Sequence, residues 1–504
     1  PDFADAHYNL GNTLVKLKKI EEAEISLKKA IELEPNFFEA YSNLGNLFYE
    51  NKGELVLAID LYKKSLNINP NFTDSWNNLY YALQANKLYS SSIEDQIPSL
   101  SNQLDSKYAQ AAKSILNYNL KIGNDSADSH LTEVVTVLSS AENTFIINPK
   151  IPFNESIKPS LPKRITAMLH FGRSGTGLLH SLIDGHPEIS TLPSIYFSEF
   201  FDHATWKKIT AGGWEEMADR FASTYAVLFN ASSSVKIASR GNQFIDNIGQ
   251  KEGMTNVGIK KNEVLSLDKN IFIKELKQLM DCHDRLDAIS FFKLVHSAYE
   301  VALNNQIKKN QIFYHIHNPD TYAQLNFLRL APNTNWLMMV REPLQSCESW
   351  ISTSFLDNNH KSICNKIFKM LFDVDQVIFQ KNNSIGVRLE DLQKYPNKTI
   401  KALCSWLDIK ENDSLYQMTV QSKKWWGDPS SPDYKKNGMS PFEKTSINRK
   451  LGLVFGKDDQ FILNTLFYPF NVHFGYTEKN SKKFKSDLQT IRPMLDQMFD
   501  FEKK

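Results

Sequence analysis

The chain has 504 residues, of which 41% are apolar and 23% are charged, and its 58 Lys and Arg residues nearly balance 57 Asp and Glu, leaving a net charge of +1. This composition is typical of a globular protein of about two to four domains, and it excludes a collagen, a wholly disordered chain and a membrane-helix bundle. A domain built mainly to coat nucleic acid should be strongly basic, so no nucleic-acid partner is expected.

The cysteines and the hydropathy of the chain indicate which metal, redox and membrane features to expect. The four cysteines, none of them in a C-x-x-C pair, show neither a zinc ribbon nor a redox motif. Their sparseness favours a reducing compartment, so a cytoplasmic location is expected. No apolar run approaches about 18 residues, and no membrane span is expected. Because residue 1 is Pro rather than Met, the natural start is expected to lie upstream.

The first part of the chain contains an internal repeat. Residues 4–12 recur at 38–46, which is 34 positions later, and in weaker form at 73–80. A period of this length predicts a stack of helix pairs. The pattern resembles the tetratricopeptide repeat, and the resemblance implies an α-solenoid with capping helices over residues 1–120.

Small and apolar residues at helical spacing are expected to form the seam of each repeat, with Gly11 and Ala23 letting the first two helices approach closely. The expected seam residues are Leu10, Leu14, Leu27 and Ala30 in the first unit and Gly45, Ala58, Tyr62 and Ser65 in the second. The closing prolines, Pro35 and Pro70, lie 35 residues apart, so the second unit carries one extra residue, near Lys52-Gly53. Tyr80 replaces the packing glycine in the third unit, which indicates that the array ends there.

A short helical array presents a curved surface, and we expect its groove to receive a protein partner. The alternative, that the array packs against the next domain or mediates self-association, stays open, as does the oligomeric state. Further helix is predicted over residues 88–120. Prolines at 152, 159 and 162 place a linker region at 121–163, followed by a second domain over 164–504.

A strand, a glycine-rich turn and a helix follow one another at the start of this second domain. Residues 165–170 have the pattern of a buried strand, and residues 178–183 that of an amphipathic helix. Such a turn lets backbone N–H groups and a helix N-terminus face an anion. The candidate anion-binding residues are Gly172, Arg173, Ser174, Gly175, Thr176, Gly177 and Leu178.

The turn is not a Walker A loop. Leu178 stands where that motif requires its lysine, and Leu179 stands where it requires the hydroxyl that holds Mg²⁺. The missing lysine therefore argues against a P-loop kinase or NTPase, which stays an alternative.

At this point the sequence resembles the sulfotransferase family. The motif G-R-S-G-T-x-L-L from Gly172, with residues 184–189 after the helix, is similar to the 5′-phosphosulfate loop of that family. The resemblance implies an α/β domain of the P-loop type, with a parallel sheet and helices on both faces. It also implies 3′-phosphoadenosine-5′-phosphosulfate (PAPS) as sulfuryl donor and 3′-phosphoadenosine-5′-phosphate (PAP) as product. The alternative is an unrelated glycine-rich turn.

A second motif follows at some distance along the chain. The apolar strand 335–340 leads into Arg341, and Ser349 follows eight residues later on the next helix. This spacing matches the 3′-phosphate motif of the sulfotransferases, in which a bidentate guanidinium and a hydroxyl converge on one phosphate. The alternative is that Arg341 forms an ion pair with Glu342 or Glu348.

Two later segments extend the resemblance. The strand that carries Arg388 is followed by Glu390 and Asp391, which we interpret as mainly structural residues. Arg449 lies in a segment that partly resembles the basic segment closing over the nucleotide, although the fuller glycine pattern is absent. Strands near 165, 311, 335 and 384 alternate with helices near 177, 319, 343 and 396, which supports the parallel sheet.

The resemblance implies a metal-independent, in-line transfer of a sulfuryl group to the hydroxyl of a carbohydrate, a tyrosine or a small molecule. Arg173 would stabilise the leaving nucleotide, and a base must accept the hydroxyl proton. The candidate bases, in order, are Glu199, His317 and His203; the alternative for each is a capping or packing role.

Two questions stay open at this stage. A non-catalytic repeat adaptor with a degenerate transferase domain is an alternative to the enzyme. The aromatic segments 197–201 and 423–426 either line an acceptor cleft or belong to the core.

Overall fold

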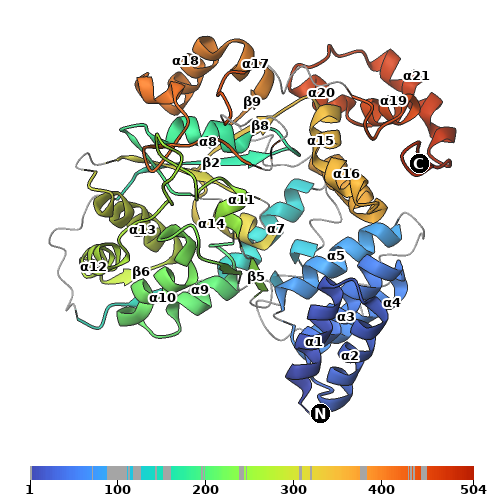
Figure 1. Cartoon of the computed structure of the whole chain (residues 1–504), viewed down its shortest axis with the longest axis horizontal. Coiled ribbons are helices and arrows are strands. Elements are labelled where there is room, and N and C mark those ends of the chain that lie inside the picture. The colour runs from blue at the N-terminus through green and yellow to red at the C-terminus, as the bar shows by residue number, and fades with distance from the viewer. Residues whose placement is uncertain are drawn as a thin grey trace.

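The computed structural model covers both expected parts of the chain. The described residues are 3–70, 72–87, 110–111, 114–116, 127–141, 145–150, 161–193, 197, 199–237, 243–245, 247–305, 309–317, 321–374, 383–429, 431, 434, 438–443 and 451–503. Figure 1 shows helices α1 to α5 beside the N-terminus and a larger part around a central sheet. Within these ranges, none of the helices combines the length and the apolar composition that crossing a bilayer requires.

Five helices form the N-terminal repeats, and consecutive helices pack side by side (Figure 1). They are α1 (Ala4–Lys16), α2 (Ile20–Leu33), α3 (Phe38–Leu47), α4 (Leu55–Ile68) and α5 (Thr73–Lys87). A Cβ at Gly11 would lie 2.7 Å from Leu27 Cγ, and a Cβ at Gly45 would lie 2.6 Å from Tyr62 Cε1. Both close helix approaches therefore require glycine, as the repeat pattern predicts.

The predicted seam is confirmed except at one position. The buried seam residues are Leu14, Leu27, Ala30, Gly45, Ala58, Tyr62 and Ser65. Leu10 is 48% exposed, so its assignment to the seam is wrong. The contact between α1 and α2 passes through Gly11 and Leu14, and Leu10 lies beside it.

The extra residue predicted in the second repeat takes the form of a π-helical turn. Residues Phe48–Lys52 continue α3 with wider spacing, and the N–H of Gly53 donates to the carbonyl of Phe48. Such a turn accommodates one inserted residue without breaking the helix. Gly53, with φ of 72°, then ends the turn in the left-handed conformation.

Five parallel strands form the central sheet. They are β2 (Arg164–His170), β3 (Ile189–Thr191), β7 (Gln311–His315), β8 (Asn335–Val340) and β9 (Ser384–Arg388), in the spatial order β3-β7-β2-β8-β9. In the register, Ala167 of β2 lies between Tyr314 and Trp336 of its two neighbours. After β2 the chain forms β3 and β7 on one side of β2, and it then crosses to form β8 and β9 on the other side. The carboxyl ends of the central strands thus flank a topological switch point, where such sheets bind ligands.

The helices of this part are distributed along the chain between and after the strands. They are α7 (Ala127–Ala141), α8 (Thr176–Asp184), α9 (His203–Thr210), α10 (Met217–Thr224), α11 (Ile248–Lys251), α12 (Lys269–Met280), α13 (Ala288–Ala302), α14 (Thr321–Leu330), α15 (Pro343–Leu356), α16 (His360–Asp373), α17 (Leu389–Lys394), α18 (Pro396–Leu407), α19 (Lys457–Leu466), α20 (Tyr468–His473) and α21 (Ser481–Ile491). Three antiparallel pairs of short strands lie outside the central sheet: β1 (Ile146–Ile147) with β6 (Arg285–Leu286), β4 (Val235–Ile237) with β5 (Gln243–Ile245), and β10 (Thr419–Val420) with β11 (Lys423–Lys424).

Helices cover both faces of the sheet. One face, which carries Met168 and Leu337, packs against α8 and α18, and the opposite face, which carries Tyr314 and Trp336, packs against α13 and α14. The predicted fold class is therefore confirmed, together with the four strands that the alternation indicated. Strand β3 was not predicted, because a strand of three residues is too short for a hydrophobic period to show.

Part of the range expected to be a linker carries regular structure. Helix α7 contributes Leu131, Val134 and Leu138 to the core beside the sheet, and β1 pairs with β6. The spacing of these three residues is that of one helix face. The linker was predicted instead from the prolines further along the chain. Within 121–163, residues 121–126, 142–144 and 151–160 lie outside the described residues, so the prediction is not compared there.

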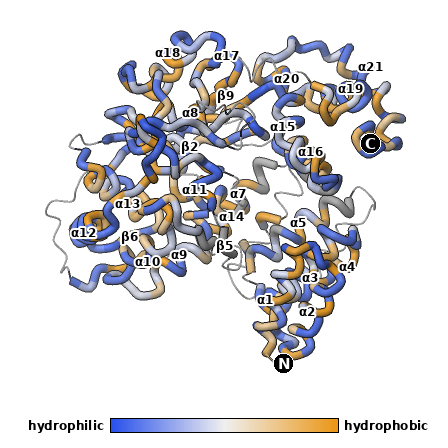
Figure 2. Tube along the Cα trace, viewed as in Figure 1, coloured by the Kyte–Doolittle hydropathy of each residue, from blue (hydrophilic) through white to orange (hydrophobic). Residues whose placement is uncertain are grey.

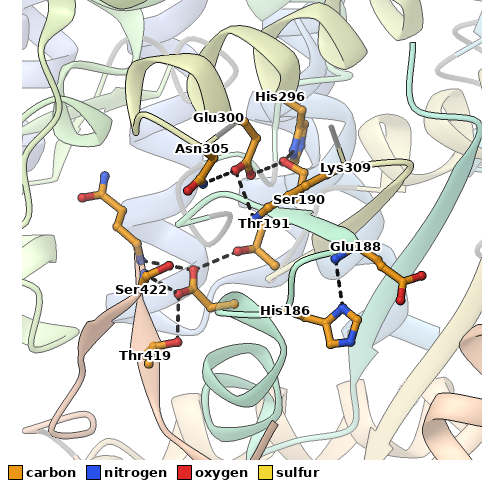
Figure 3. A network of polar contacts seen from close by, with 12 residues as sticks. His186, Glu188, Ser190, Thr191, His296, Glu300, Asn305, Lys309, Thr419 and Ser422 are labelled. Carbon is orange, nitrogen blue, oxygen red and sulfur yellow. Dashed lines mark hydrogen bonds and ion pairs between the residues drawn. The ribbon is translucent and has the colours of Figure 1, made fainter. Parts of the chain in front are cut away.

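A buried polar network fixes the end of α8 to the β10–β11 hairpin (Figure 3). The carboxylate of Asp184 accepts hydrogen bonds from the hydroxyls of Thr191 (2.8 Å) and Thr419 (3.0 Å). The backbone N–H of Ser422 donates to the same carboxylate over 3.0 Å. Because Asp184 is only 5% exposed, this carboxylate orders the hairpin from within the protein.

A second buried group joins β3 to α13 (Figure 3). The hydroxyl of Ser190 donates to Glu300 over 2.7 Å, and Lys309 lies 3.1 Å from the same carboxylate. His296 Nδ1 lies 3.0 Å from the Ser190 hydroxyl oxygen. The short strand β3 is thereby held at the sheet edge by side chains as well as by its backbone.

Figure 2 shows hydrophobic residues alternating with hydrophilic ones along most helices of both parts. This is the pattern of amphipathic helices that bury one side against a core.

Candidate functional site

A cavity of about 480 Å³ lies at the carboxyl ends of β2, β7 and β8. Its walls include the turn Gly172–Leu178 after β2, His317 after β7 and Arg341 after β8, and Ser349 of α15 lies on the same wall. Both predicted phosphate motifs, although far apart in the sequence, therefore meet in one cavity at the topological switch point.

The glycine-rich turn has the backbone of an anion cradle. Gly172 and Gly175 have left-handed conformations, with φ of 59° and 87°. A Cβ at Gly172 would lie 2.5 Å from Ser346 Oγ, and one at Gly175 would lie 2.9 Å from Leu389 Cδ1. Gly175 is the N-cap of α8, so the first turn of this helix forms part of the cavity wall.

Ser174 gives the turn a buried hydroxyl that could donate to an anion. The side chain is 1% exposed and lines the cavity, and its hydroxyl makes no hydrogen bond to any described residue. A buried hydroxyl without a partner costs about 1–3 kcal/mol, and an anionic oxygen that accepts its proton would remove this cost. The hydroxyl, the turn and the helix N-terminus together fit a phosphate or sulfate group.

Arg341 comes directly after β8 and is buried. It is 3% exposed, and its Nη2 donates to Gln345 Oε1 over 3.1 Å. Pro343 begins α15, and Glu342 caps that helix by accepting from the backbone N–H groups of Leu344 and Gln345. Strand end and helix start are therefore fixed relative to each other, and Arg341 is presented to the cavity.

The acidic neighbours of Arg341 have other tasks. Besides Glu342, the carboxylate of Glu348 accepts hydrogen bonds from the backbone N–H groups of four successive residues, 452–455. No ion pair joins Arg341 to Glu342 or Glu348 among the described residues, but burial raises the pKa of Glu342 and the charge of Arg341 acts to lower it, so the two side chains do interact. Glu348 instead ties the C-terminal segment to α15, one residue before Ser349.

Lys366 is a cation of the cavity that the sequence analysis missed. It lies on α16, lines the cavity, and donates to Ser354 Oγ (2.8 Å) and to the carbonyl of Trp350 (3.2 Å). Burial, and then the charge of Arg173, lower the pKa of Lys366 from its usual value. It stands outside any motif, and no signal in the sequence marks it.

Four histidines surround the inner end of the cavity. His170 stacks on His317 with ring centroids 5.4 Å apart, and His315 lies 5.5 Å from His317 and 5.7 Å from His180. Burial lowers the pKa of His317 to about 3, with smaller contributions from His170 and Arg173, so His317 is neutral at pH 7. Among the described residues, no group of three or more His, Cys, Asp or Glu side chains is arranged to hold a metal ion.

Three other predicted site residues are not found on the described wall of the cavity. Glu199 is not among the described residues that line the cavity, and its charge acts on Tyr225 in the core. His203 is the first residue of α9, and its side chain lies outside the description. Arg449 also lies outside the described residues. The cavity therefore brings together the turn, Arg341, Ser349 and His317.

Two carboxylates that the sequence analysis did not single out face the turn. Glu252, just after α11, and Asp428, just after β11, both line the cavity. Asp428 Oδ2 lies 3.6 Å from Arg173 Nη2. Burial, followed by the charge of Asp428, raises the pKa of Glu252 to about 7, and Arg173 acts in the opposite direction. Neither residue stands in a recognisable motif.

The two aromatic segments have different places. Trp425 lines the cavity, and at 5% exposure it also packs in the core that contains α8 and α18. Phe197, Phe200 and Phe201 are at most 1% exposed and pack within the core beside the sheet, so the core alternative holds for this segment. Glu390 is structural as interpreted: it accepts from the N–H of Glu342 over 2.9 Å.

Comparison with known proteins identifies the N-terminal part. Family models described as TPR repeat and tetratricopeptide repeat match residues 11–52 and 38–72. No curated protein matches the sequence. Solved structures similar to the chain include a sulfotransferase domain from the curacin biosynthetic pathway, at 15% identity and a TM-score of 0.29, covering 51% of this chain and 77% of that one. A sulfotransferase domain from the Synechococcus PCC 7002 olefin synthase has 13% identity and a TM-score of 0.34, covering 62% of this chain and 98% of that one. Residues 11–72 are thus tetratricopeptide repeats, and both of these similar structures are sulfotransferase domains.

Proposed function

We propose that the protein is a sulfotransferase that moves a sulfuryl group from PAPS to the hydroxyl of an acceptor. The observation that carries this proposal is the meeting of the turn Gly172–Leu178 with Arg341 and Ser349 in one cavity. Two groups suited to anions on the wall of one cavity, one with the buried Ser174 hydroxyl and one with a buried guanidinium, suit a nucleotide that carries phosphate at both ends of its ribose.

The roles of the residues follow from where charge develops. During in-line transfer the bond from sulfur to the bridging oxygen breaks, and negative charge grows on the phosphate that leaves. Arg173, the Ser174 hydroxyl and the N–H groups at the start of α8 would bind this phosphosulfate end. Preorganised donors of this kind lower the barrier because they are in place before the charge develops.

The other end of the nucleotide would occupy the wall formed by α15 and α16. Arg341 and Ser349 would hold the 3′-phosphate. Lys366, on the same wall, adds a second cation there. A guanidinium held by Gln345 is preorganised for bidentate contact with phosphate oxygens, which lowers the entropy lost on binding.

The acceptor is a carbohydrate, a tyrosine or a small molecule with a free hydroxyl. The tetratricopeptide repeats would dock a protein partner, either an acceptor or a carrier of one. We also place the protein in a reducing, cytoplasmic compartment.

Calorimetric titration with PAP, without metal, tests the proposal beside a titration with ATP and Mg²⁺. Tight binding of PAP and none of ATP is the expected result, since Leu178 replaces the Walker lysine. Binding of ATP with Mg²⁺, followed by its turnover, would replace the proposal with a P-loop kinase or NTPase. Binding of neither nucleotide would favour a repeat adaptor with a degenerate transferase domain.

A further inference from the structure

Helix α15 turns one side toward a hydrophobic core that also contains Phe171, the residue before the glycine-rich turn. The apolar side chains that α15 contributes to this core are Leu344, Cys347 and Ile351. Glu348 lies four residues after the first of these and three before the last, so it belongs to the same side of the helix. It is only 6% exposed. The side of α15 that packs against the core therefore carries a buried carboxylate.

Backbone N–H groups fill the acceptor sites of this carboxylate. Its Oε1 accepts from Gly452 and Leu453, each over 3.1 Å. Its Oε2 accepts from Val454 over 3.4 Å and from Phe455 over 3.1 Å. Four successive N–H groups that turn to one side form a concave backbone site for an anion. Gly452 begins this site with φ of 116°, a conformation that favours glycine. The segment 452–455 thus binds the charge of Glu348 through its backbone.

Another side of α15 faces the cavity. Ser349 and Thr353, which are one helical turn apart, both line the cavity. Gln345, one turn before Ser349, accepts a hydrogen bond from Arg341. Successive residues of a helix are about 100° apart around its axis, so the direction of Glu348 fixes the direction of Ser349. A carboxylate bound on one side of α15 therefore sets which side chains the helix presents to the cavity.

We propose that Glu348 is a positioning residue of the 3′-phosphate site. Bound by the backbone of 452–455, its carboxylate fixes the rotation of α15, so that Ser349 and the Gln345–Arg341 pair face the nucleotide. This inference rests on the proposed function. Glu348 is not among the described residues that line the cavity, so it acts through Ser349 and Arg341 and not by touching the nucleotide.

The positioning depends on a carboxylate and not only on a side chain of that size. Glutamine has one acceptor oxygen, and its NH₂ group is a donor. In Glu348→Gln the NH₂ group would face N–H groups of the segment 452–455, and some of these buried donors would lose their acceptor. The segment and α15 would then move apart. Glu348→Asp keeps two acceptor oxygens and should preserve most of the contact.

Competition calorimetry with PAP and adenosine 5′-phosphate tests the inference, because the ratio of the two affinities reports on the 3′-phosphate alone. We expect this ratio to fall about tenfold or more in E348Q, while adenosine 5′-phosphate still binds within about threefold of the wild type. E348D should keep the ratio within about threefold. A purely structural role would weaken both nucleotides alike. An E348Q variant that keeps the wild-type ratio would overturn the inference.

Asp459→Asn is the matched control. Asp459 is also a buried carboxylate that accepts backbone N–H groups, those of Gly456 (3.1 Å), Asp500 (2.7 Å) and Phe501 (3.3 Å). These donors all belong to the C-terminal segment and none to α15. D459N should lower the midpoint of urea unfolding, as E348Q does, but keep the preference for PAP. An equal loss of preference in both variants would contradict the inference, because general loosening of the C-terminal segment would then explain it.

Gly452→Ala keeps the inference testable if E348Q does not fold. A Cβ there would meet nothing within 4 Å, so the substitution acts through φ alone and distorts the backbone site without touching Glu348. We expect the preference for PAP to fall in G452A. Gly53→Ala, at φ of 72° with nothing within 4 Å, is its control in the repeats. An unchanged preference in G452A would count against the inference. Failure of the wild type to bind PAP is a different result, because it would remove the proposed function itself.

Discussion

The hydroxyl of Ser346 donates a hydrogen bond to the carbonyl of Phe171 over 2.8 Å. Phe171 directly precedes the glycine-rich turn, and Ser346 lies on α15 between Arg341 and Ser349. This bond, buried at both ends, couples the two phosphate motifs through a direct contact. The distance between the two proposed anion sites is therefore set by the packing of α15 against the end of β2.

Gly172→Ala tests this junction. A Cβ there would meet Ser346 Oγ at 2.5 Å, and the backbone φ of 59° disfavours any other residue. We expect at least a tenfold loss of PAP affinity in calorimetry, because strain and overpacking of about 1–3 kcal/mol would shift the turn. Gly213→Ala is the control: its φ is 71°, but a Cβ there would meet nothing within 4 Å. An unchanged affinity in G172A would show that the turn tolerates displacement.

Arg341→Ala should remove the preference for a nucleotide with a 3′-phosphate. Wild type is expected to bind PAP more tightly than adenosine 5′-phosphate, and the variant to bind both with similar affinity. A charge-assisted hydrogen bond contributes about 1.5–3 kcal/mol, which corresponds to roughly 10- to 150-fold in affinity. Competition calorimetry with the two nucleotides measures this ratio. A preference that survives in R341A would place the 3′-phosphate elsewhere.

If the cavity binds PAP as proposed, we expect Lys366 to give that binding an alkaline limit. Burial lowers the pKa of this lysine, so it loses its proton at a lower pH than an exposed lysine would. PAP affinity of the wild type should therefore weaken as pH rises toward 10. Lys366→Arg keeps the charge at every accessible pH and should remove the decline. An identical decline in K366R would mean that Lys366 does not contact the nucleotide.

Asp184→Asn is expected to destabilise the protein and to loosen the β10–β11 hairpin. The Asp184 carboxylate accepts hydrogen bonds from the hydroxyls of Thr191 and Thr419 and from the N–H of Ser422. The asparagine amide has only one acceptor oxygen in its place. We expect a loss of about 2–4 kcal/mol in urea unfolding, because buried donors to a charged group would be left poorly satisfied. Asp408→Asn is the matched control, since Asp408 forms an exposed ion pair with Arg164 and should cost less than about 1 kcal/mol.

The sequence predicts the fold well and the site in part, for physical reasons that differ between residues. Gly11, Gly172 and Arg341 belong to patterns with fixed spacing, and spacing is visible in one dimension. Glu252 and Lys366 enter the cavity from segments without any motif, because packing of distant elements brings them there. Proximity of that kind has no signature in a single sequence.

The buried histidines make the protein sensitive to acid. Burial lowers the pKa of His296 and His317 to about 3, and it also lowers the pKa of His180 and His315. In the unfolded chain these groups bind protons near pH 6.5, so the unfolded state takes up protons that the native state excludes. Stability should therefore be complete above pH 7 and fall as pH drops from about 6.5 toward 4.

The size of this effect can be measured by urea unfolding as a function of pH. Each neutral buried histidine contributes at most about 1.4 kcal/mol per pH unit below the pKa of the unfolded chain. His317→Gln removes one titrating group, so the slope of the free energy of unfolding against pH should become shallower by up to that amount. His360→Gln is the control, because His360 is exposed at the start of α16. A slope that H317Q leaves unchanged would mean that His317 is protonated in the native protein, and a positively charged ring stacked on His170 would then face the phosphosulfate end of the cavity.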